Sequence, residues 1–310
     1  MPPHAPGLDG PVEPPEEVES FDVGVIGLGP AGVTAATELV RYGYNVVAVE
    51  RERIGGLVHL ARKIDNFPGI PPSSPGTIIV EMLWEHLGRF PPKIIDADVG
   101  NIYQTGVGYA ISLGETAVTV RSLVLASGTR PKLLGLPGED LPWVYHAWTD
   151  VRAGPGSTVA VVGGGDLAID QALSLNEGGR RVELLLRSGS TRCNRQLQNE
   201  LDVVEGIHIR TDCPPLRFED EHGPTVVYAK GGHEVKLPVD GVLVSIGREP
   251  SLPHLNDAIL GLDRARYLAP EGLLLAGDVV ADRRRQVAIA MGSGLDAAMR
   301  VDEYLRRVDE

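Results

Sequence analysis

Cysteine is nearly absent from this chain, whose 310 residues contain only two, Cys193 and Cys213. Their positions match neither a metal-binding nor a dithiol motif, so we expect no metal site and no disulfide framework. So few cysteines are typical of proteins in a reducing compartment. The sequence therefore predicts a cytoplasmic protein without a bound metal.

An excess of positive charge and long apolar runs are also missing. The formal net charge is −13, which argues against nucleic acid or an anionic membrane as the main partner. No apolar run approaches the roughly 20 residues of a membrane span. Residues 1–20 lack the basic and apolar regions of a secretory signal, and their Pro, Glu and Gly content predicts a disordered extension.

What the chain does contain is enough apolar residue for two domains. Hydrophobic residues make up 43% of the sequence and charged residues 23%, which is ordinary for a globular protein. A length of 310 residues suits two domains of common size.

Residues 21–50 have the pattern strand, glycine turn, helix, strand. Gly27, Gly29 and Gly32 show the G-x-G-x-x-G spacing of dinucleotide-binding turns. In that motif the first glycine makes the turn, the second lets a pyrophosphate approach the backbone, and the third lets the helix pack closely. The helix N-terminus offers free N–H groups and the positive end of its dipole. Glu50 ends the second strand 18 residues after Gly32, where its carboxylate can accept hydrogen bonds from ribose hydroxyls. The predicted cofactor-binding residues here are Gly27, Gly29, Pro30, Ala31, Gly32, Glu50 and Arg51.

A second unit of the same kind begins at residue 158. An apolar strand over 158–162 enters a turn of the form GxGxxA, followed by a helix over 168–175 and a strand over 182–186. Two such units in one chain indicate a flavin together with a nicotinamide cofactor. The predicted binding residues of this turn are Gly163, Gly165, Asp166, Leu167 and Ala168.

The rest of the chain has weaker patterns. We expect a helix over 77–90, short strands within 93–125 and 202–246, a turn at 248–250, an apolar strand over 273–278 that ends in Gly277-Asp278, and a final helix over 285–305. The stretch 133–150 has the composition of a loop and marks the crossing between domains.

These motifs together resemble the low-molecular-weight thioredoxin reductases over about residues 21–306. The resemblance rests on GLGPAG, Glu50, IGG (54–56), IDNFPGI (64–70), ASGTRP (126–131), LGLPGE (134–139), VVGGGDLA (161–168), DGVLVSIGREP (240–250), AGDV (276–279) and RQVAIAMGSG (285–294). It implies an α/β fold of two doubly wound, Rossmann-type domains. The FAD domain would comprise 21–130 and 248–310, and an inserted NAD(P)H domain would comprise 131–247, after the extension 1–20.

The resemblance also implies further flavin contacts and a homodimer. Asp278 would hold the ribityl or pyrophosphate region of FAD, and Asn66 would lie near the flavin. Arg285, Gln286 and Val287 would face the edge of the isoalloxazine ring. The remaining cofactor-binding residues of this group are Gly56, Gly128 and Gly277.

One departure from the family concerns its redox chemistry. The family carries Cys-x-x-Cys followed by Asp, with the second cysteine 14 residues before the second glycine turn; counting back from Gly163 places Thr149 there. His146 and Thr149 therefore occupy the cysteine positions, and Asp150 keeps the acidic one. Because an imidazole and a hydroxyl cannot form a disulfide, the usual thioredoxin reductase route is closed.

A second departure concerns the nicotinamide cofactor. The family ends the second strand of its inserted domain with cations that hold the 2′-phosphate of NADPH. Here the run is Leu186-Arg187-Ser188, with Arg192 following. No acid stands at Leu186 to select NADH, and Arg187 and Arg192 are either a phosphate clamp or two solvated loop arginines. We expect NADPH, with NADH as the alternative.

The sequence thus predicts an FAD-dependent NAD(P)H oxidoreductase without a redox dithiol. Its electron acceptor would be a protein carrier, a quinone-like molecule or oxygen. His146 and Asp150 are candidates for proton handling at the active site. The alternative for these positions is that His146 and Trp148 only fill the space of the lost disulfide. The alternative for the whole chain is a flavin-binding scaffold or sensor without turnover.

Overall fold

The structure is a computed structural model that describes residues 18–255, 271–282 and 284–310. Residues 1–17, most of the expected disordered extension, lie outside the described residues. The described chain forms two compact units. The first comprises the described residues within 1–54, 85–127 and 252–310, and the second comprises 55–84 and 128–251. Segment 55–84 thus groups with the second unit, whereas the sequence assigns it to the FAD domain.

The first unit is built on one large sheet. Its strand order is β17-β4-β5-β6-β1-β2-β3, and β18 pairs with β6. The pairs of β1 with β2 and β6, β2 with β3, and β6 with β18 are parallel, while β4, β5 and β6 form an antiparallel meander. The strands are β1 (Glu19–Ile26), β2 (Val46–Glu50), β3 (Lys93–Asp96), β4 (Asn101–Thr105), β5 (Gly108–Leu113), β6 (Thr116–Leu125), β17 (His254–Leu255) and β18 (Leu273–Leu275).

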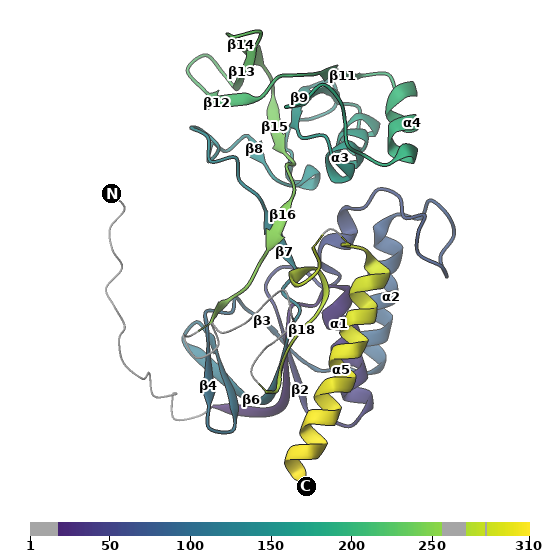
Figure 1. Ribbon diagram of the computed structural model, residues 1–310, viewed down its shortest axis with the longest axis vertical. Coiled ribbons are helices and arrows are strands. Elements are labelled where there is room, and N and C mark those ends of the chain that lie inside the picture. The colour runs from purple at the N-terminus through teal and green to yellow at the C-terminus, as the bar shows by residue number, and fades with distance from the viewer. Residues whose placement is uncertain (1–17, 256–270, 283) are drawn as a thin grey trace. The chain divides into compact units, whose positions relative to one another are not determined.

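Two helices, α1 (Pro30–Arg41) and α5 (Val287–Asp309), lie side by side against this sheet (Figure 1). Pro30 starts α1, where the missing N–H costs no hydrogen bond. The helices approach closely because small residues meet, and a Cβ on Gly294 would lie 2.1 Å from the carbonyl oxygen of Ala31. The helices thus hold the first glycine turn and the C-terminal segment together.

The second unit contains a five-stranded parallel sheet in the order β11-β10-β9-β15-β8. Its strands are β8 (Val144–Tyr145), β9 (Thr158–Val162), β10 (Arg181–Leu185), β11 (Ile207–Arg210) and β15 (Gly241–Val244). An antiparallel sheet comprises β12 (Pro215–Glu219), β13 (Thr225–Lys230) and β14 (His233–Pro238), and β7 (Thr129–Pro131) pairs with β16 (Arg248–Pro250). Residues 248–250, expected as a turn, form a strand because they pair antiparallel with residues 129–131. The Nε of Arg248 also donates to the Thr129 hydroxyl at 2.9 Å.

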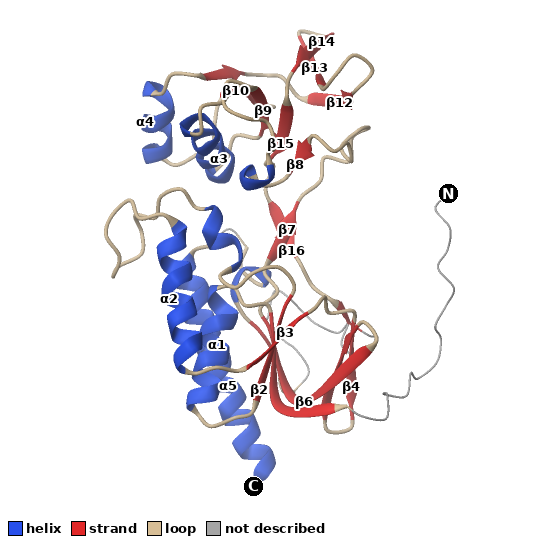
Figure 2. Ribbon diagram, turned by 180° about the vertical axis from the view of Figure 1, so that it is seen from behind, coloured by secondary structure: helices blue, strands red, loops and turns tan. Residues whose placement is uncertain are grey.

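Different elements cover the two faces of the parallel sheet (Figure 2). The helices α3 (Asp166–Glu177) and α4 (Arg195–Val203) pack on one face. On the other, the antiparallel sheet closes a core in which the rings of Trp143 and Phe218 meet edge to face at 6.2 Å. The sequence did not predict α4, whose start is marked by Asn194, an N-cap residue that accepts the N–H of Leu197 at 3.1 Å.

Segment 55–84, with the 3₁₀ helix Gly56–Leu60 and most of α2 (Gly76–Arg89), is held to α3 and α4 by a buried arginine. The side chain of Arg62 is 7% exposed and contacts Asp170 at 3.3 Å, Glu177 at 2.8 Å and Glu200 at 2.7 Å. Burial lowers the pKa of Arg62, but the three carboxylates outweigh it and raise the pKa. Burial raises the pKa of Asp170, which Arg62 offsets only in part.

We predict that Arg62→Met destabilises the second unit by about 3–5 kcal/mol, because it leaves the partly buried carboxylate of Asp170 without its cation, while Glu200 keeps Lys63 at 3.0 Å. The measurement is the unfolding midpoint, followed by a probe in the second unit. Arg41→Ala is the matched control, since Arg41 is 52% exposed beside Glu38 and such pairs are worth about 1 kcal/mol or less. Equal effects of the two substitutions would contradict the structural role of Arg62.

Candidate functional site

The carboxyl ends of parallel strands meet at one edge of the sheet in the first unit. Ile26 of β1 pairs with Leu125 of β6 and with Val49 of β2, and Leu275 of β18 also pairs with Leu125. The turn after β1 therefore lies beside the chain that leaves β2 and β18. In doubly wound sheets, ligands bind outside this edge.

The first and third glycines of this turn are required by the packing of the chain itself. Gly27 has φ of +91°, and a Cβ there would lie 2.5 Å from the carbonyl oxygen of Ala126. A Cβ on Gly32 would lie 1.8 Å from the carbonyl oxygen of Gly27. Any side chain at Gly32 would therefore push α1 away from the turn.

The middle glycine is different, because nothing in the described structure requires it. Gly29 has an ordinary φ of −68° and is the N-cap residue of α1, and no atom lies within 4 Å of where its Cβ would be. Open space at a helix N-terminus fits a pyrophosphate, which the free N–H groups of the first turn can bind. The turn thus fits the cofactor that the motif predicts.

Glu50, at the end of β2, is fixed by backbone donors. Its Oε2 accepts the N–H of Leu28 at 2.7 Å, and its Oε1 accepts the N–H groups of Glu52 at 2.9 Å and Arg51 at 3.1 Å. Two carboxylate oxygens can accept about four hydrogen bonds. The carboxylate is therefore held beside the glycine turn with capacity left for a ribose hydroxyl.

The C-terminal segment places Gly277 and Asp278 at the same edge. Gly277 has φ of +77°, and a Cβ there would lie 2.8 Å from that of Ala31. Ser293 of α5 accepts the N–H of Gly277 at 2.7 Å and donates to Ala290 at 2.8 Å. Sequence reasoning did not single out Ser293, although it lies within the motif RQVAIAMGSG.

The predicted residues before α5 surround the N-terminus of that helix. Gln286 is the N-cap residue, Val287 is the first helical residue, and Arg285 Nε donates to the carbonyl oxygen of Ala281 at 3.2 Å. By contrast, Gly56, Asn66 and Gly128 belong to the second unit. Their contact with a flavin remains a prediction.

The second glycine turn repeats this geometry at the carboxyl end of β9. Gly163 has φ of +144°, and a Cβ there would lie 2.1 Å from the carbonyl oxygen of Ser245. Gly165, the N-cap residue of α3, has φ of −91° and no atom within 4 Å of a Cβ. The third position is Ala168, a buried residue of α3 that belongs to the core between this helix and its sheet. The pattern again leaves the middle glycine open to a ligand.

The first turn of α3 and the loop after β10 contact each other. The carboxylate of Asp166 accepts the N–H of Asn194 at 2.6 Å, and the carbonyl of Gly164 accepts the N–H of Arg192 at 2.6 Å. Leu167 is partly exposed beside them. Leu186, where an acid would select NADH, is 2% exposed and belongs to the core.

Arg187 and Arg192 are exposed. Within the described ranges, neither guanidinium has an ion-pair or hydrogen-bond partner. Both are thus available to a phosphate group.

His146 and Asp150 follow β8, whose carboxyl end lies at the same edge of the parallel sheet as the second glycine turn. His146 is half-buried, and among the described residues its Nδ1 is a buried atom without a hydrogen-bond partner. Asp150 is exposed and accepts a hydrogen bond from the Thr149 hydroxyl at 3.3 Å. Trp148 packs on the core around α3 and donates to the carbonyl oxygen of Leu60 at 3.0 Å.

The model of the pyridine nucleotide-disulphide oxidoreductase family matches residues 21–294. The chain belongs to this family. It is 28% identical to the thioredoxin reductase of Mycolicibacterium smegmatis over 309 residues, covering 93% of this chain and 97% of that protein. It is also 28% identical to NADPH-dependent thioredoxin reductase 3 of Arabidopsis thaliana, covering 92% of this chain but only 58% of the relative.

Solved structures agree with this assignment. The crystal structure of Lactococcus lactis thioredoxin reductase in its FR conformation superposes with a TM-score of 0.84 at 25% identity, covering 93% of this chain and 99% of that one. The resemblance to low-molecular-weight thioredoxin reductases and the fold of two Rossmann-like domains are thereby confirmed. Membership of the family implies that the chain binds FAD and NAD(P)H.

The family's redox chemistry needs a pair of cysteines, which this member lacks. Cys193 and Cys213, the two cysteines of the chain, are both free thiols. Cys213 is buried and donates to the carbonyl oxygen of Thr211 at 3.0 Å, and Cys193 contacts Gln198 at 3.6 Å. In the described part of the chain, no cluster of three or more His, Cys, Asp and Glu side chains could hold a metal, and no helix could span a membrane.

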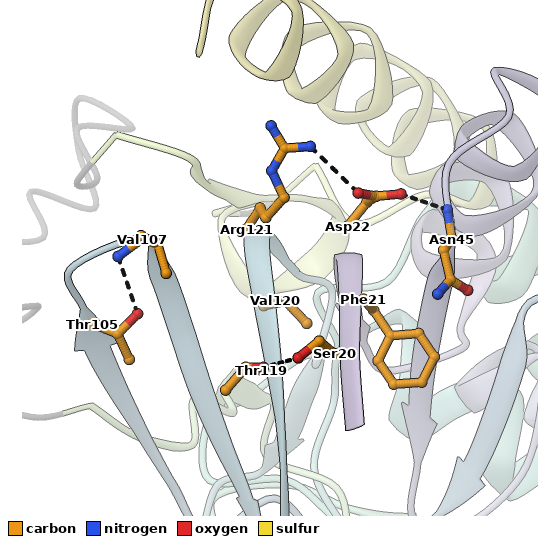
Figure 3. A pocket seen from close by; sticks show the side chains of 9 residues that line it. All are labelled: Ser20, Phe21, Asp22, Asn45, Thr105, Val107, Thr119, Val120 and Arg121. Atoms are coloured by element: carbon orange, nitrogen blue, oxygen red, sulfur yellow. Dashed lines mark hydrogen bonds and ion pairs between the residues drawn. The ribbon is translucent and has the colours of Figure 1, made fainter. Parts of the chain in front are cut away.

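A cavity of about 460 Å³ lies at the opposite edge of the first unit's sheet (Figure 3). It is lined by the first residues of β1, by Asn45 just before β2, and by the middle of β6. Arg121 in its wall pairs with Asp22 at 3.4 Å and with Asp309. Because it lies at the amino ends of the strands, this cavity is separate from the dinucleotide turn.

We predict that Gly29→Val prevents FAD binding, because the new side chain fills the open space at the N-terminus of α1. For the same reason at α3, Gly165→Val should weaken NAD(P)H binding at least tenfold while FAD stays bound. Flavin absorbance and nicotinamide titration measure the two effects. Gly88→Val is the control, since Gly88 also has open space around a Cβ but lies on α2. Full flavin occupancy in Gly29→Val would contradict the assignment.

Proposed function

We propose that this protein is an FAD-dependent NAD(P)H oxidoreductase that delivers electrons to an acceptor without using a dithiol of its own. The observation that carries the proposal is the pair of glycine turns. Each has an open middle glycine at a helix N-terminus, Gly29 in one unit and Gly165 in the other. In the first unit, the strand after the helix ends at the carboxylate of Glu50, which suits a ribose. In the second unit, the corresponding strand is followed by the exposed Arg187 and Arg192.

Glu50 and the N-terminus of α1 would hold the adenosine and pyrophosphate of FAD. Gly277 and Asp278, which follow the adjoining strand β18, and the N-terminus of α5 would contact the same cofactor. When bound, FAD supplies two-electron chemistry with the nicotinamide. The second turn and its arginines would hold NADPH, and NADH less well. We assign FAD to the first turn because an acid follows it, and the nicotinamide cofactor to the second turn because two cations follow it.

His146 is proposed as a group that moves a proton, with Asp150 beside it. The buried Nδ1 of His146 has no hydrogen-bond partner among the described residues, and a catalytic role is one explanation of such an atom, beside a bound water or ion. The packing of Trp148 supports the alternative in which that residue only fills the space of a disulfide. We therefore assign no chemistry to Trp148.

The acceptor is proposed to be a small molecule such as a quinone, a small redox protein, or oxygen. The missing cysteine pair supports the exclusion of disulfide exchange, because neither His146 nor Thr149 can become a thiolate. A net charge of −13 supports the exclusion of nucleic acid and anionic membranes. The scarcity of cysteine supports a cytoplasmic location.

Anaerobic stopped-flow mixing with NADPH tests the proposal. We expect flavin bleaching, followed by reoxidation by a quinone or by oxygen, and no reduction of thioredoxin or a small aromatic disulfide above that by free flavin. His146→Asn should slow reoxidation more than reduction if His146 delivers the proton. Bound FAD that neither NADPH nor NADH bleaches would instead support a scaffold or sensor without turnover.

We predict that Arg187→Ala lowers the preference for NADPH over NADH roughly threefold to tenfold, since one charged hydrogen-bonding partner of the 2′-phosphate is lost. The measurement is the ratio of kcat/KM for the two cofactors. Arg181→Ala is the matched control, because Arg181 lies at the amino end of the same strand and is also exposed. An unchanged ratio in Arg187→Ala would show that the arginine is only solvated.

We also predict a homodimer, formed in part by α5. Leu295 and Met299 are 40% and 49% exposed, and because they are four residues apart they lie on one side of α5 as an exposed apolar pair. Leu295→Asp should shift sedimentation toward a 33.1 kDa monomer, whereas Val203→Asp on α4 should not. A wild-type monomer at micromolar concentration would refute the prediction.

A further inference from the structure

Two hydrogen bonds join the second glycine turn to the loop after β10, residues 187–194, one to a backbone carbonyl of the turn and one to a side-chain carboxylate. The carbonyl of Gly164 and the carboxylate of Asp166 lie on the turn, and the N–H groups of Arg192 and Asn194 lie on the loop. Both contacts measure 2.6 Å, shorter than the usual hydrogen bond from an amide N–H. The loop is therefore attached to the turn at two points, two residues apart.

The same loop is attached at its other side to α4. Asn194 caps that helix through the N–H of Leu197 at 3.1 Å, and Thr191 hydrogen bonds with Gln198. Asn194 thus uses its N–H on Asp166 and its side chain on α4. The two arginines of the loop, Arg187 and Arg192, are left exposed while the backbone that bears them is fixed.

The negative charge of Asp166 would oppose the binding of a phosphate at the second glycine turn if its carboxylate faced the phosphate. Asp166 is exposed and stands in the first turn of α3, where the pyrophosphate of a dinucleotide would bind. Because its Oδ1 accepts the N–H of Asn194, the carboxylate is directed toward the loop. The carbonyl oxygen of Gly164 likewise accepts the N–H of Arg192. Both acceptors of the turn are thus hydrogen-bonded to backbone N–H groups of the loop.

We infer that Asp166 is a positioning residue for cofactor selection, which holds loop 187–194 on the glycine turn so that Arg187 and Arg192 present a preformed site to the 2′-phosphate. This inference rests on the proposed NADPH preference and deepens it. Asp166 therefore acts through the loop and not on the cofactor. Its loss leaves both arginines in the chain but removes one of the two attachments of the loop, so that only the bond from Arg192 to Gly164 remains. The loop is then less ordered beside Arg192, and ordering it on binding weakens the affinity.

The test uses the FAD-loaded protein and two probes, adenosine 2′,5′-bisphosphate and 5′-AMP, which differ by the 2′-phosphate alone. We expect the wild type to prefer the bisphosphate and Asp166→Ala to lose roughly fivefold to tenfold of that preference, with little change for 5′-AMP. Asp166→Asn should restore it, since the amide oxygen still accepts the N–H of Asn194. Asp240→Ala is the matched control, because Asp240 accepts the N–H of Thr158 at 2.7 Å at the opposite end of β9.

Equal weakening of both probes in Asp166→Ala would overturn the inference, since it would indicate a general structural role. So would an unchanged or increased preference for the bisphosphate, which would indicate that Asp166 only repels phosphate. A wild type without any preference would refute NADPH selection itself. Hydrogen exchange of the Arg192 and Asn194 amides then tests the attachment separately, and exchange as slow in Asp166→Ala as in the wild type would refute it.

Discussion

The close approach of a helix to its own strand turn is the constraint on which both nucleotide sites depend. In the first unit a Cβ on Gly32 would lie 1.8 Å from the carbonyl oxygen of Gly27, so α1 can begin only where glycine occupies this position. That contact fixes the N-terminus of α1 and, with it, the open space at Gly29. The second unit tolerates Ala168 at the equivalent position, and its open space at Gly165 is preserved. The sites are thus consequences of packing that exists before any cofactor binds.

The sequence could predict those parts of the fold that short, fixed spacings determine. The strand over 158–162 has the bounds of β9, and both glycine turns begin helices as expected. Interactions between distant residues could not be predicted. The partners of Arg62 are 108, 115 and 138 residues away, and no local pattern distinguishes a buried arginine from an exposed one. The helix α4 was missed because it is largely polar and buries only Leu201, although Asn194 is a recognisable N-cap residue.

The segment that corresponds to the family's dithiol by sequence, residues 146–149, is held in this chain by other contacts. Trp148 packs on the core of α3 and is tied to Leu60, and Thr149 bonds to Asp150. These contacts stabilise the segment without a cross-link. Because both cysteines elsewhere are free and one is buried, no second thiol pair replaces the lost one. The cysteines of this chain therefore supply no thiol pair for disulfide exchange.

The acidity of the protein also constrains how it binds anionic cofactors. With a net charge of −13, the long-range field of the molecule repels a dinucleotide, but salt screens that field within about 8–10 Å. Affinity must then come from donors in direct contact. The N-termini of α1 and α3 offer such N–H groups, and in the proposed function the exposed arginines after β10 add to them. Donors of this kind are effective only when their geometry is fixed in advance. The glycine contacts fix the helix ends, and the hydrogen bonds from loop 187–194 to the second turn fix the backbone that carries the arginines.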